Sequence, residues 1–196
     1  MTTRAIFSLL SSVVLLAGAI PYFIDIHHGK ARPHILSWIG WAFITALGAS
    51  AMHAEGSRWV IAILVANSFN SLFIAAYATF KKVGIWSTGI YDYIFIGLGA
   101  LGLVLWQTLD MPILALVSAI TADLCFGIPT IIKTYKNPAT ETRFVWTAAA
   151  ASGLLSLFAI QTFAFYEVAY PLYLFIFDAT VLMLVLKIVK NPHSPK

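Results

Sequence analysis

Two acidic residues lie inside long apolar stretches of this chain, where a carboxyl group can do chemistry. Asp178 falls near the middle of the last apolar stretch, and Asp123 falls near the middle of the fifth. An acid inside a membrane span is costly, and it usually faces a solute pathway or a partner. No Lys or Arg is expected at the depth of Asp178, so its carboxyl group could carry a proton or accept hydrogen bonds from a hydroxylated substrate. The alternative is a neutral acid that is bonded to a neighbouring backbone or hydroxyl group.

Three polar residues in the third apolar stretch, Asn67, Asn70 and Ser71, are spaced at i, i+3 and i+4. On a helix this spacing places them on one face. An Asn side chain in hydrocarbon must find hydrogen-bonding partners, either on another helix or on a substrate. The cluster therefore predicts the wall of a central binding cavity, with hydrogen bonding between helices as the alternative.

Tryptophan residues mark the start of two apolar stretches. Trp38 and Trp146 each follow a polar loop, and Trp41 lies about one helical turn deeper than Trp38. A Trp at this depth is by default an anchor at the membrane interface. The sharper hypothesis is that these residues form either a cytoplasmic gate or a stacking surface for a sugar ring.

Proline recurs near the ends of two apolar stretches, as Pro21 in the first and Pro129 in the fifth. Proline removes an amide donor and clashes with the preceding turn, so it kinks or loosens a helix. Two such positions suit the hinges of a protein that opens alternately on two sides. Static kinks are the alternative.

These positions belong to an internal repeat, because the two prolines are separated by 129 − 21 = 108 residues. At the same offset Trp38 meets Trp146, and Asn70 meets Asp178. Each half of the chain carries three apolar stretches, and one further stretch joins the halves. Three plus one plus three stretches, with both repeats in the same sense, is a known layout of small membrane transporters.

The composition indicates an integral membrane protein. Of the 196 residues, 60% are hydrophobic and 10% are charged, and the mean hydropathy is +0.87. Soluble domains are about 45–50% apolar and about 25% charged. Several apolar runs reach the roughly 18–20 residues that span a bilayer, and the alternating polarity of barrel strands is absent. We therefore expect an all-α membrane protein with seven transmembrane helices.

The expected helices cover residues 5–26, 35–54, 58–80, 88–107, 112–135, 143–160 and 168–189. They predict a first three-helix bundle over residues 5–82, a linker helix within 83–111, a second three-helix bundle over 112–190 and a cytoplasmic tail over 191–196. The connections are too short to form a soluble domain.

The basic residues predict the orientation in the membrane. With seven spans the termini lie on opposite sides, and the side of the N-terminus holds only Arg4 and Arg58 among the 12 Lys and Arg residues. The other 10 of the 12 lie on the side of the C-terminus. Basic residues in short loops favour the cytoplasm. We therefore expect a plasma (inner) membrane protein with its N-terminus outside and its C-terminus in the cytoplasm.

The sequence carries no motif for a metal, a nucleotide or a covalent mechanism. His27 and His28 are adjacent and cannot share a helix face, and Walker, zincin, nucleophile-elbow and dinucleotide patterns are absent. We expect no cofactor, no metal and no enzymatic activity. Basic residues at the membrane surface explain the basic composition, so nucleic acid is not an expected partner. The expected partners are a small-molecule substrate and the lipid bilayer, and a homo-oligomer is left open.

Two loop motifs add a family resemblance. The segment PYFID at 21–25 runs on to Gly29-Lys30 and Arg32-Pro33, and PTIIK at 129–133 runs on to Asn137-Pro138 and Glu141. With two three-helix repeats, a linker helix and an outside N-terminus, the chain resembles the SWEET and PQ-loop superfamily, which includes the KDEL receptors. The resemblance covers roughly residues 5 to 190.

The resemblance implies roles for several residues. It implies that Pro21 and Pro129 are hinges, and that an Asn on the third helix of each bundle faces the substrate pocket. Asn67 is the best match to that Asn, and its repeat partner is Phe175. The expected substrate-binding set is Asn67, Asn70, Ser71, Asp178, Phe175 and Trp41.

Three functions follow as expectations. The first is ATP-independent transport of a small polar solute, expected to be sugar-like, by alternating access between the bundles. The second is a proton-coupled carrier of an amino acid or another metabolite, in which Asp178 and Asp123 carry the proton. The third is a receptor for a peptide end, as in KDEL receptors. Basic side chains in the cavity would be needed for the third, but they are expected only near helix ends.

Overall fold

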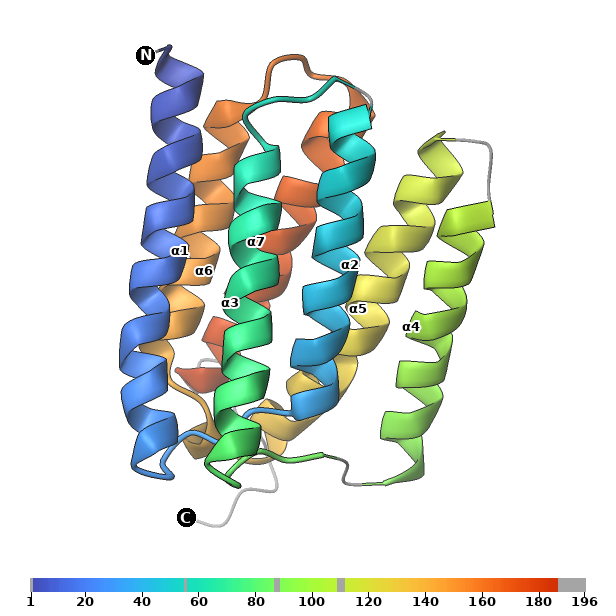
Figure 1. Cartoon of the computed structure of the whole chain (residues 1–196). Helices are drawn as coiled ribbons and strands as arrows, with labels where there is room; N and C mark the ends of the chain where they lie inside the picture. The colour runs from blue at the N-terminus through green and yellow to red at the C-terminus, as the bar shows by residue number, and fades with distance from the viewer. Residues whose placement is uncertain (1, 55, 87–88, 109–111, 187–196) are drawn as a thin grey trace.

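The computed structural model describes residues 2–54, 56–86, 89–108 and 112–186. In these residues the chain forms seven α-helices and two short 3-10 helices, with no strand beyond one isolated β-bridge between His34 and Ile85. The α-helices run side by side as one bundle (Figure 1). The α-helices are α1 Thr3–His27, α2 Ile35–Ala54, α3 Ile61–Phe80, α4 Ile90–Thr108, α5 Pro112–Lys136, α6 Arg143–Ser156 and α7 Phe165–Val185, and the 3-10 helices are η1 Pro138–Thr140 and η2 Leu157–Ala159.

The helices are those of a membrane protein. Within the described residues four apolar segments are long enough to cross a bilayer, namely Thr3–His27, Ile61–Phe80, Leu116–Lys136 and Phe165–Val185, and α2 and α6 carry shorter apolar segments. Large apolar side chains cover the outside of the bundle, and those of Leu9, Phe73 and Ile176 are each more than half exposed. Such a surface is unfavourable in water and favourable in hydrocarbon. The expected membrane protein with an all-α fold is therefore confirmed.

We call α1–α3, which carry the first copy of the sequence repeat, the first half of the bundle, and α5–α7, which carry the second copy, the second half. In the first half α3 packs on both α1 and α2, and in the second half α7 packs on both α5 and α6. Between the halves α1 packs on α6, and α2 packs on α5. Exchanging α1, α2 and α3 for α5, α6 and α7 leaves this set of six contacts unchanged. Helix α4 stands at the edge of the bundle, against α5 and α2 (Figure 1).

The α1–α6 and α2–α5 contacts use equivalent positions of the repeat. A Cβ atom on Gly18 would lie 2.0 Å from the Cβ of Ala148, and one on Gly40 would lie 2.3 Å from the ring of Phe126. Adding the offset of 108 turns Gly18 into Phe126 and Gly40 into Ala148. At both contacts the backbone of a first-half helix approaches its neighbour too closely for any side chain. The repeat read from the sequence is therefore also a repeat of helix contacts.

The helix boundaries differ most from the expected ones near Glu167. The sixth helix ends at Ser156 and continues only as η2, and α7 begins at Phe165 instead of 168. The carboxylate of Glu167, in the first turn of α7, accepts hydrogen bonds from the backbone amides of Gln161 and Thr162 at 2.5 and 2.8 Å. These bonds satisfy backbone amides of the turn between η2 and α7. The expected helix end at 187–189 and the expected tail lie outside the described residues.

Candidate functional site

A small cavity lies between the two halves of the bundle. Twelve described residues line it, and they come from every described α-helix except α4: four aromatic residues, two acids, two asparagines and four aliphatic residues. About 30 Å³ of the cavity is open to the centre of a water molecule. A space of this size holds one or a few water molecules. In this conformation the cavity is therefore too small for a solute much larger than water.

Aromatic rings form one part of the cavity wall. The indole rings of Trp38 and Trp41 in α2 and Trp146 in α6 meet the ring of Phe177 in α7. The ring centroids of Trp38 and Trp41 are 5.1 Å apart with planes at 89°, and those of Trp41 and Phe177 are 5.5 Å apart at 74°. Trp146 lies 6.0 Å from Trp38 and 6.2 Å from Trp41. The ring of Trp41 thus stands at a steep angle to the other three, whereas the planes of Trp38 and Trp146 are inclined to each other by only 40°.

The two acids of the wall have different surroundings. The carboxylate of Asp123 in α5 accepts hydrogen bonds from the hydroxyl groups of Tyr170, at 2.6 Å, and Tyr173, at 2.9 Å. The indole N–H of Trp41 donates to the backbone carbonyl of Asp123 at 3.2 Å, which joins α2 to α5. The carboxyl group of Asp178 in α7 lines the same cavity, and no described residue hydrogen-bonds to it or forms an ion pair with it. Asp123 is therefore held in place, whereas Asp178 is available to a solute.

The polar face of α3 contributes two amides to the cavity. Asn67 and Asn70 line it, and the side chain of Asn70 is 3% exposed. The side-chain oxygen of Asn70 has no hydrogen-bond partner among the described residues. A buried amide oxygen without a partner costs about 1–3 kcal/mol, so a buried water or a solute is the expected partner. Ser71 is fully buried on the same helix but is not part of the cavity wall.

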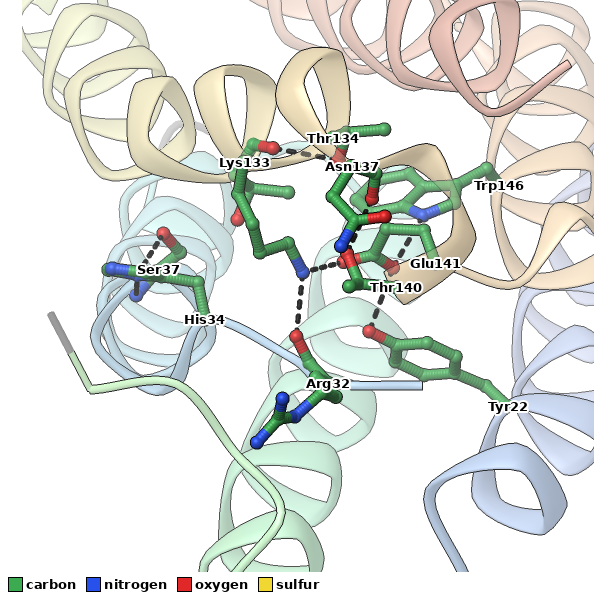
Figure 2. A network of polar contacts seen from close by, with 11 residues as sticks. Tyr22, Arg32, His34, Ser37, Lys133, Thr134, Asn137, Thr140, Glu141 and Trp146 are labelled. Atoms are coloured by element: carbon green, nitrogen blue, oxygen red, sulfur yellow. Dashed lines mark hydrogen bonds and ion pairs between the residues drawn. The ribbon is translucent and has the colours of Figure 1, made fainter. Parts of the chain in front are cut away.

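A buried polar network closes one end of the bundle, which we call the Glu141 end (Figure 2). Lys133 of α5 and Glu141 form a buried ion pair. The carboxylate of Glu141 also accepts hydrogen bonds from the hydroxyl of Tyr22 and the indole N–H of Trp146, each at 2.9 Å. The ammonium group of Lys133 donates to the backbone carbonyl of Arg32 at 2.8 Å. A buried pair is stable only when its remaining polar atoms are satisfied, and this network satisfies them.

Several bonds of the Glu141 end cross from one half to the other. Besides the bond from Tyr22, the hydroxyl of Thr142 donates to the carboxylate of Asp25 at 2.6 Å. The backbone amide of Arg32 donates to the carbonyl of Thr140 at 2.9 Å. Arg32 and Thr140 are themselves partners at the offset of 108. The loops after α1 and α5 therefore bind each other where the repeat brings them together.

Contacts also join the halves at the opposite end, which we call the Glu167 end. The carboxylate of Glu167 accepts a hydrogen bond from the hydroxyl of Ser57 in the loop before α3, at 3.2 Å. Glu167 is 3% exposed, and its carboxylate also holds the turn before α7. Separating the halves at this end would expose the Ser57 contact to solvent. The cavity is thus enclosed between two sets of contacts that involve both halves.

Seven of the expected site residues meet at the cavity, and the others lie elsewhere. The cavity brings together Trp38, Trp41, Asn67, Asn70, Asp123, Trp146 and Asp178. Phe175 lies at the contact of α7 with α6, where its backbone nitrogen is 2.9 Å from a Cβ built on Gly153. Pro21 and Pro129 lie inside α1 and α5, away from the cavity wall.

Further residues, which the sequence patterns above do not predict, complete the site. Tyr170, Tyr173 and Phe177 follow the i, i+3, i+7 spacing of one helix face, and that pattern beside Asp178 was the available signal. Glu141 and Lys133 were noted only as ends of loop motifs, and nothing local in the sequence predicts their pairing. The hydroxyl of Tyr22 reaches Glu141 across 119 residues of chain.

Comparisons with known proteins leave the family of this chain open. No family model matches the chain, no curated protein matches it, and no solved structure matches its fold. Its function is therefore inferred from the cavity, the repeat and the two closed ends.

Proposed function

We propose that this chain transports a small polar solute across a membrane by ATP-independent alternating access. The observation that supports this best is the symmetry of the cavity wall. Eight of its twelve residues form four pairs at the offset of 108. The pairs are Leu15 with Asp123, Trp38 with Trp146, Trp41 with Ala149, and Asn70 with Asp178. A site on the axis between two like halves is the usual place for the substrate of a repeat transporter.

The proposed architecture is two parallel three-helix bundles joined by a linker helix, as in the SWEET and PQ-loop superfamily. The bundles are α1–α3 and α5–α7, and α4 is the linker. An odd number of joining spans gives both bundles the same orientation in the membrane. The exchange symmetry of the helix contacts supports this arrangement. The loops that carry PYFID and PTIIK meet at the Glu141 end, as two equivalent loops would.

The proposed orientation places the Glu141 end in the cytoplasm of a cell whose plasma (inner) membrane holds the protein. Lys30, Arg32, Lys81, Lys136 and Arg143 all lie in or beside the loops at that end. Arg58 lies in the loop between α2 and α3, at the other end. This distribution favours a cytoplasmic Glu141 end and an external N-terminus.

In the proposed cycle the two ends open in turn. Opening the Glu141 end breaks the bonds from Tyr22, Lys133 and Thr142 that cross between the halves, and opening the Glu167 end breaks the contact with Ser57. Pro21 and Pro129 would act as hinges because each interrupts the backbone bonding of its helix close to the Glu141 end. The structure described here, with both sets of contacts made, corresponds to an occluded state.

Proton coupling is the second candidate, and the state of Asp178 favours it. An acid that faces a closed cavity without a cationic partner can bind a proton when the cavity is dry and release it when an end opens. Asp123 is a less suitable proton carrier because two tyrosine hydroxyl groups already hold it. A peptide-end receptor receives less support, because none of the described cavity-lining residues is basic.

Uptake into proteoliposomes tests the proposal. Purified protein would be screened for binding of sugars, amino acids and vitamins, and binders would then be tested for uptake with and without an imposed pH gradient. Asn70→Ala and Asp178→Asn should reduce uptake strongly. Ser71→Ala is the matched control, because Ser71 lies beside Asn70 on α3 but outside the cavity wall. The proposal fails if no solute enters faster than in protein-free liposomes, or if all three variants behave like the wild type.

A further inference from the structure

The charge of the cavity is one-sided. Asp123 and Asp178 both line it, and none of its described lining residues is Lys, Arg or His. Tyr170 and Tyr173 donate hydrogen bonds to Asp123 but bring no positive charge. A carboxylate in a low-dielectric site gains most from an opposite charge, because hydrogen bonds alone replace only part of its lost hydration. The wall of the cavity therefore lacks a cation that a bound solute could supply.

The rings of the aromatic part of the wall pack edge to face around Trp41, with centroids 5.1 to 6.2 Å from its own. The planes of Trp41 make angles of 89° with Trp38, 77° with Trp146 and 74° with Phe177. A flat sugar ring stacks best on one broad aromatic face, whereas steeply inclined rings can surround a compact, round group. Aromatic faces attract cations through their quadrupole, most strongly when water is excluded, and Trp is the best ring for this purpose.

These observations point to one class of substrate. Resting on the transporter function proposed above, we propose that the cavity binds a small organic ammonium ion that carries a hydroxyl group. The ammonium head would lie among the rings of Trp38, Trp41 and Trp146, with Asp178 as its counter-ion. The hydroxyl group would donate to the side-chain oxygen of Asn70, which has no partner among the described residues.

Other small solutes fit the wall less well. A neutral sugar would leave both acids without an opposite charge, so they would have to be protonated to receive it. An amino acid would bring its own carboxylate next to two acids, and none of the described lining residues is a cation that could bind it. An ammonium ion without a carboxylate matches the acids, the rings and the free amide oxygen at once.

Binding also requires the halves to separate. The 30 Å³ open to water centres holds a few water molecules but not a quaternary ammonium group. The solute must therefore enter an opened state, and its measured affinity is reduced by the fraction of protein that is closed. Opening either end breaks hydrogen bonds between the two halves. The contacts that the protein makes with the cation must compensate for the loss of those bonds.

Choline and its uncharged carbon isostere 3,3-dimethylbutan-1-ol are the decisive probes, because they share shape and hydroxyl group and differ in charge. Titration calorimetry on the purified full-length chain should show choline binding at least tenfold tighter than the isostere. Glucose and lysine serve as the neutral-sugar and amino-acid probes. Uptake of labelled choline into proteoliposomes should be saturable, and tetramethylammonium should compete with it.

Two variants locate the site. Asp178→Asn should weaken choline binding at least tenfold and leave binding of the isostere nearly unchanged, because only the charged ligand loses its counter-ion. Trp38→Leu should weaken choline binding, and Trp38→Phe should restore most of it, because the ring and not the indole N–H contacts the cation. Trp59→Leu, at a partly exposed position outside the cavity wall, is the matched control. Thermal unfolding of each variant checks that it is folded.

The outcomes separate this inference from the proposed function. If the isostere binds as well as choline, or if Asp178→Asn leaves choline binding unchanged, the cation site is refuted. If glucose or another neutral solute is transported and choline neither binds nor competes, the transporter function stands and the ammonium class is overturned. If choline binds in the cavity but no labelled solute accumulates in proteoliposomes, the site stands and the transporter function is overturned.

Discussion

Replacing Tyr22 by Phe should open the Glu141 end without disturbing the rest of the site. The Tyr22 side chain is fully buried, and its hydroxyl donates to the Glu141 carboxylate at 2.9 Å across the boundary between the halves. The ring itself packs on Trp38 with centroids 5.7 Å apart, a contact that Phe retains. Lys133 and Trp146 lie in the same half as Glu141, so the ion pair and the indole bond can persist when the end opens.

The magnitude follows from the loss of one hydrogen bond to a charged group. Such a bond contributes about 1.5–3 kcal/mol. In the closed state the Phe variant leaves one carboxylate position unsatisfied, whereas in the open state water takes that place. At 1.4 kcal/mol for each factor of ten, the ratio of open to closed protein should rise roughly 10- to 100-fold. Changing Glu141 itself is less informative, because it would leave Lys133 buried without its counter-charge and cost about 3–5 kcal/mol of stability.

Thiol labelling measures this shift. The chain has one cysteine, Cys125, so a Cys125→Ala background with Ala149→Cys places a single reporter in the cavity wall. A membrane-impermeant thiol reagent should label the reporter roughly 10- to 100-fold faster from the Glu141 side in the Tyr22→Phe variant, and more slowly from the other side. Tyr135→Phe is the matched control, because the Tyr135 hydroxyl makes no hydrogen bond within the described residues. An unchanged rate, or an equal rise from both sides, would refute the gate.

Three further predictions concern the hinges, the central acid and the helix contacts. Pro21→Ala and Pro129→Ala should slow uptake more than they weaken binding, because they change the interconversion of the open and closed states and leave the cavity wall unchanged. Unchanged uptake rates would show that both prolines are static kinks. If Asp178 carries a proton, Asp178→Asn should remove any pH dependence of transport. If Asp178 only binds the substrate, the same change should weaken substrate binding at every pH. Uptake and binding measured from about pH 5 to 8 separate the two outcomes. Gly40→Ala should destabilise the protein by about 1–3 kcal/mol in denaturant unfolding, because its Cβ would overlap an aromatic ring, whereas Gly97→Ala, with open space around it, should not.

The helices that carry the site residues, and the depth of those residues, could be predicted from the sequence. They depend only on local patterns and on the internal repeat. Helix length and apolar content follow from short windows, and the offset of 108 places Asn70 and Asp178 at one depth before any contact is known. The spacing of Asn67 and Asn70 on one face needs only helix geometry. All of these residues meet in the cavity.

The partners of those residues could not be predicted, because they depend on which helix faces meet. Tyr170 reaches Asp123 over 47 residues and Tyr22 reaches Glu141 over 119, and neither pairing leaves a local pattern. The position of Phe175 also could not be predicted from the sequence. The offset pairs it with Asn67, yet its backbone lies against α6, and Phe177 lines the cavity wall instead.

The acidic residues of the site lie at positions where the two halves differ in sequence. Asp123, Asp178, Glu141 and Glu167 all belong to the second half, and at the offset of 108 the first half has Leu15, Asn70, Pro33 and Trp59 in their places. The two halves form a cavity at their boundary, and both acids that line it belong to the second half. A bound ammonium ion would therefore be drawn toward α5 and α7, and its uncharged end would face the amides of α3. Two halves of identical sequence would present the same side chains to both ends of a solute. These two halves differ in sequence, so they distinguish one end of the solute from the other.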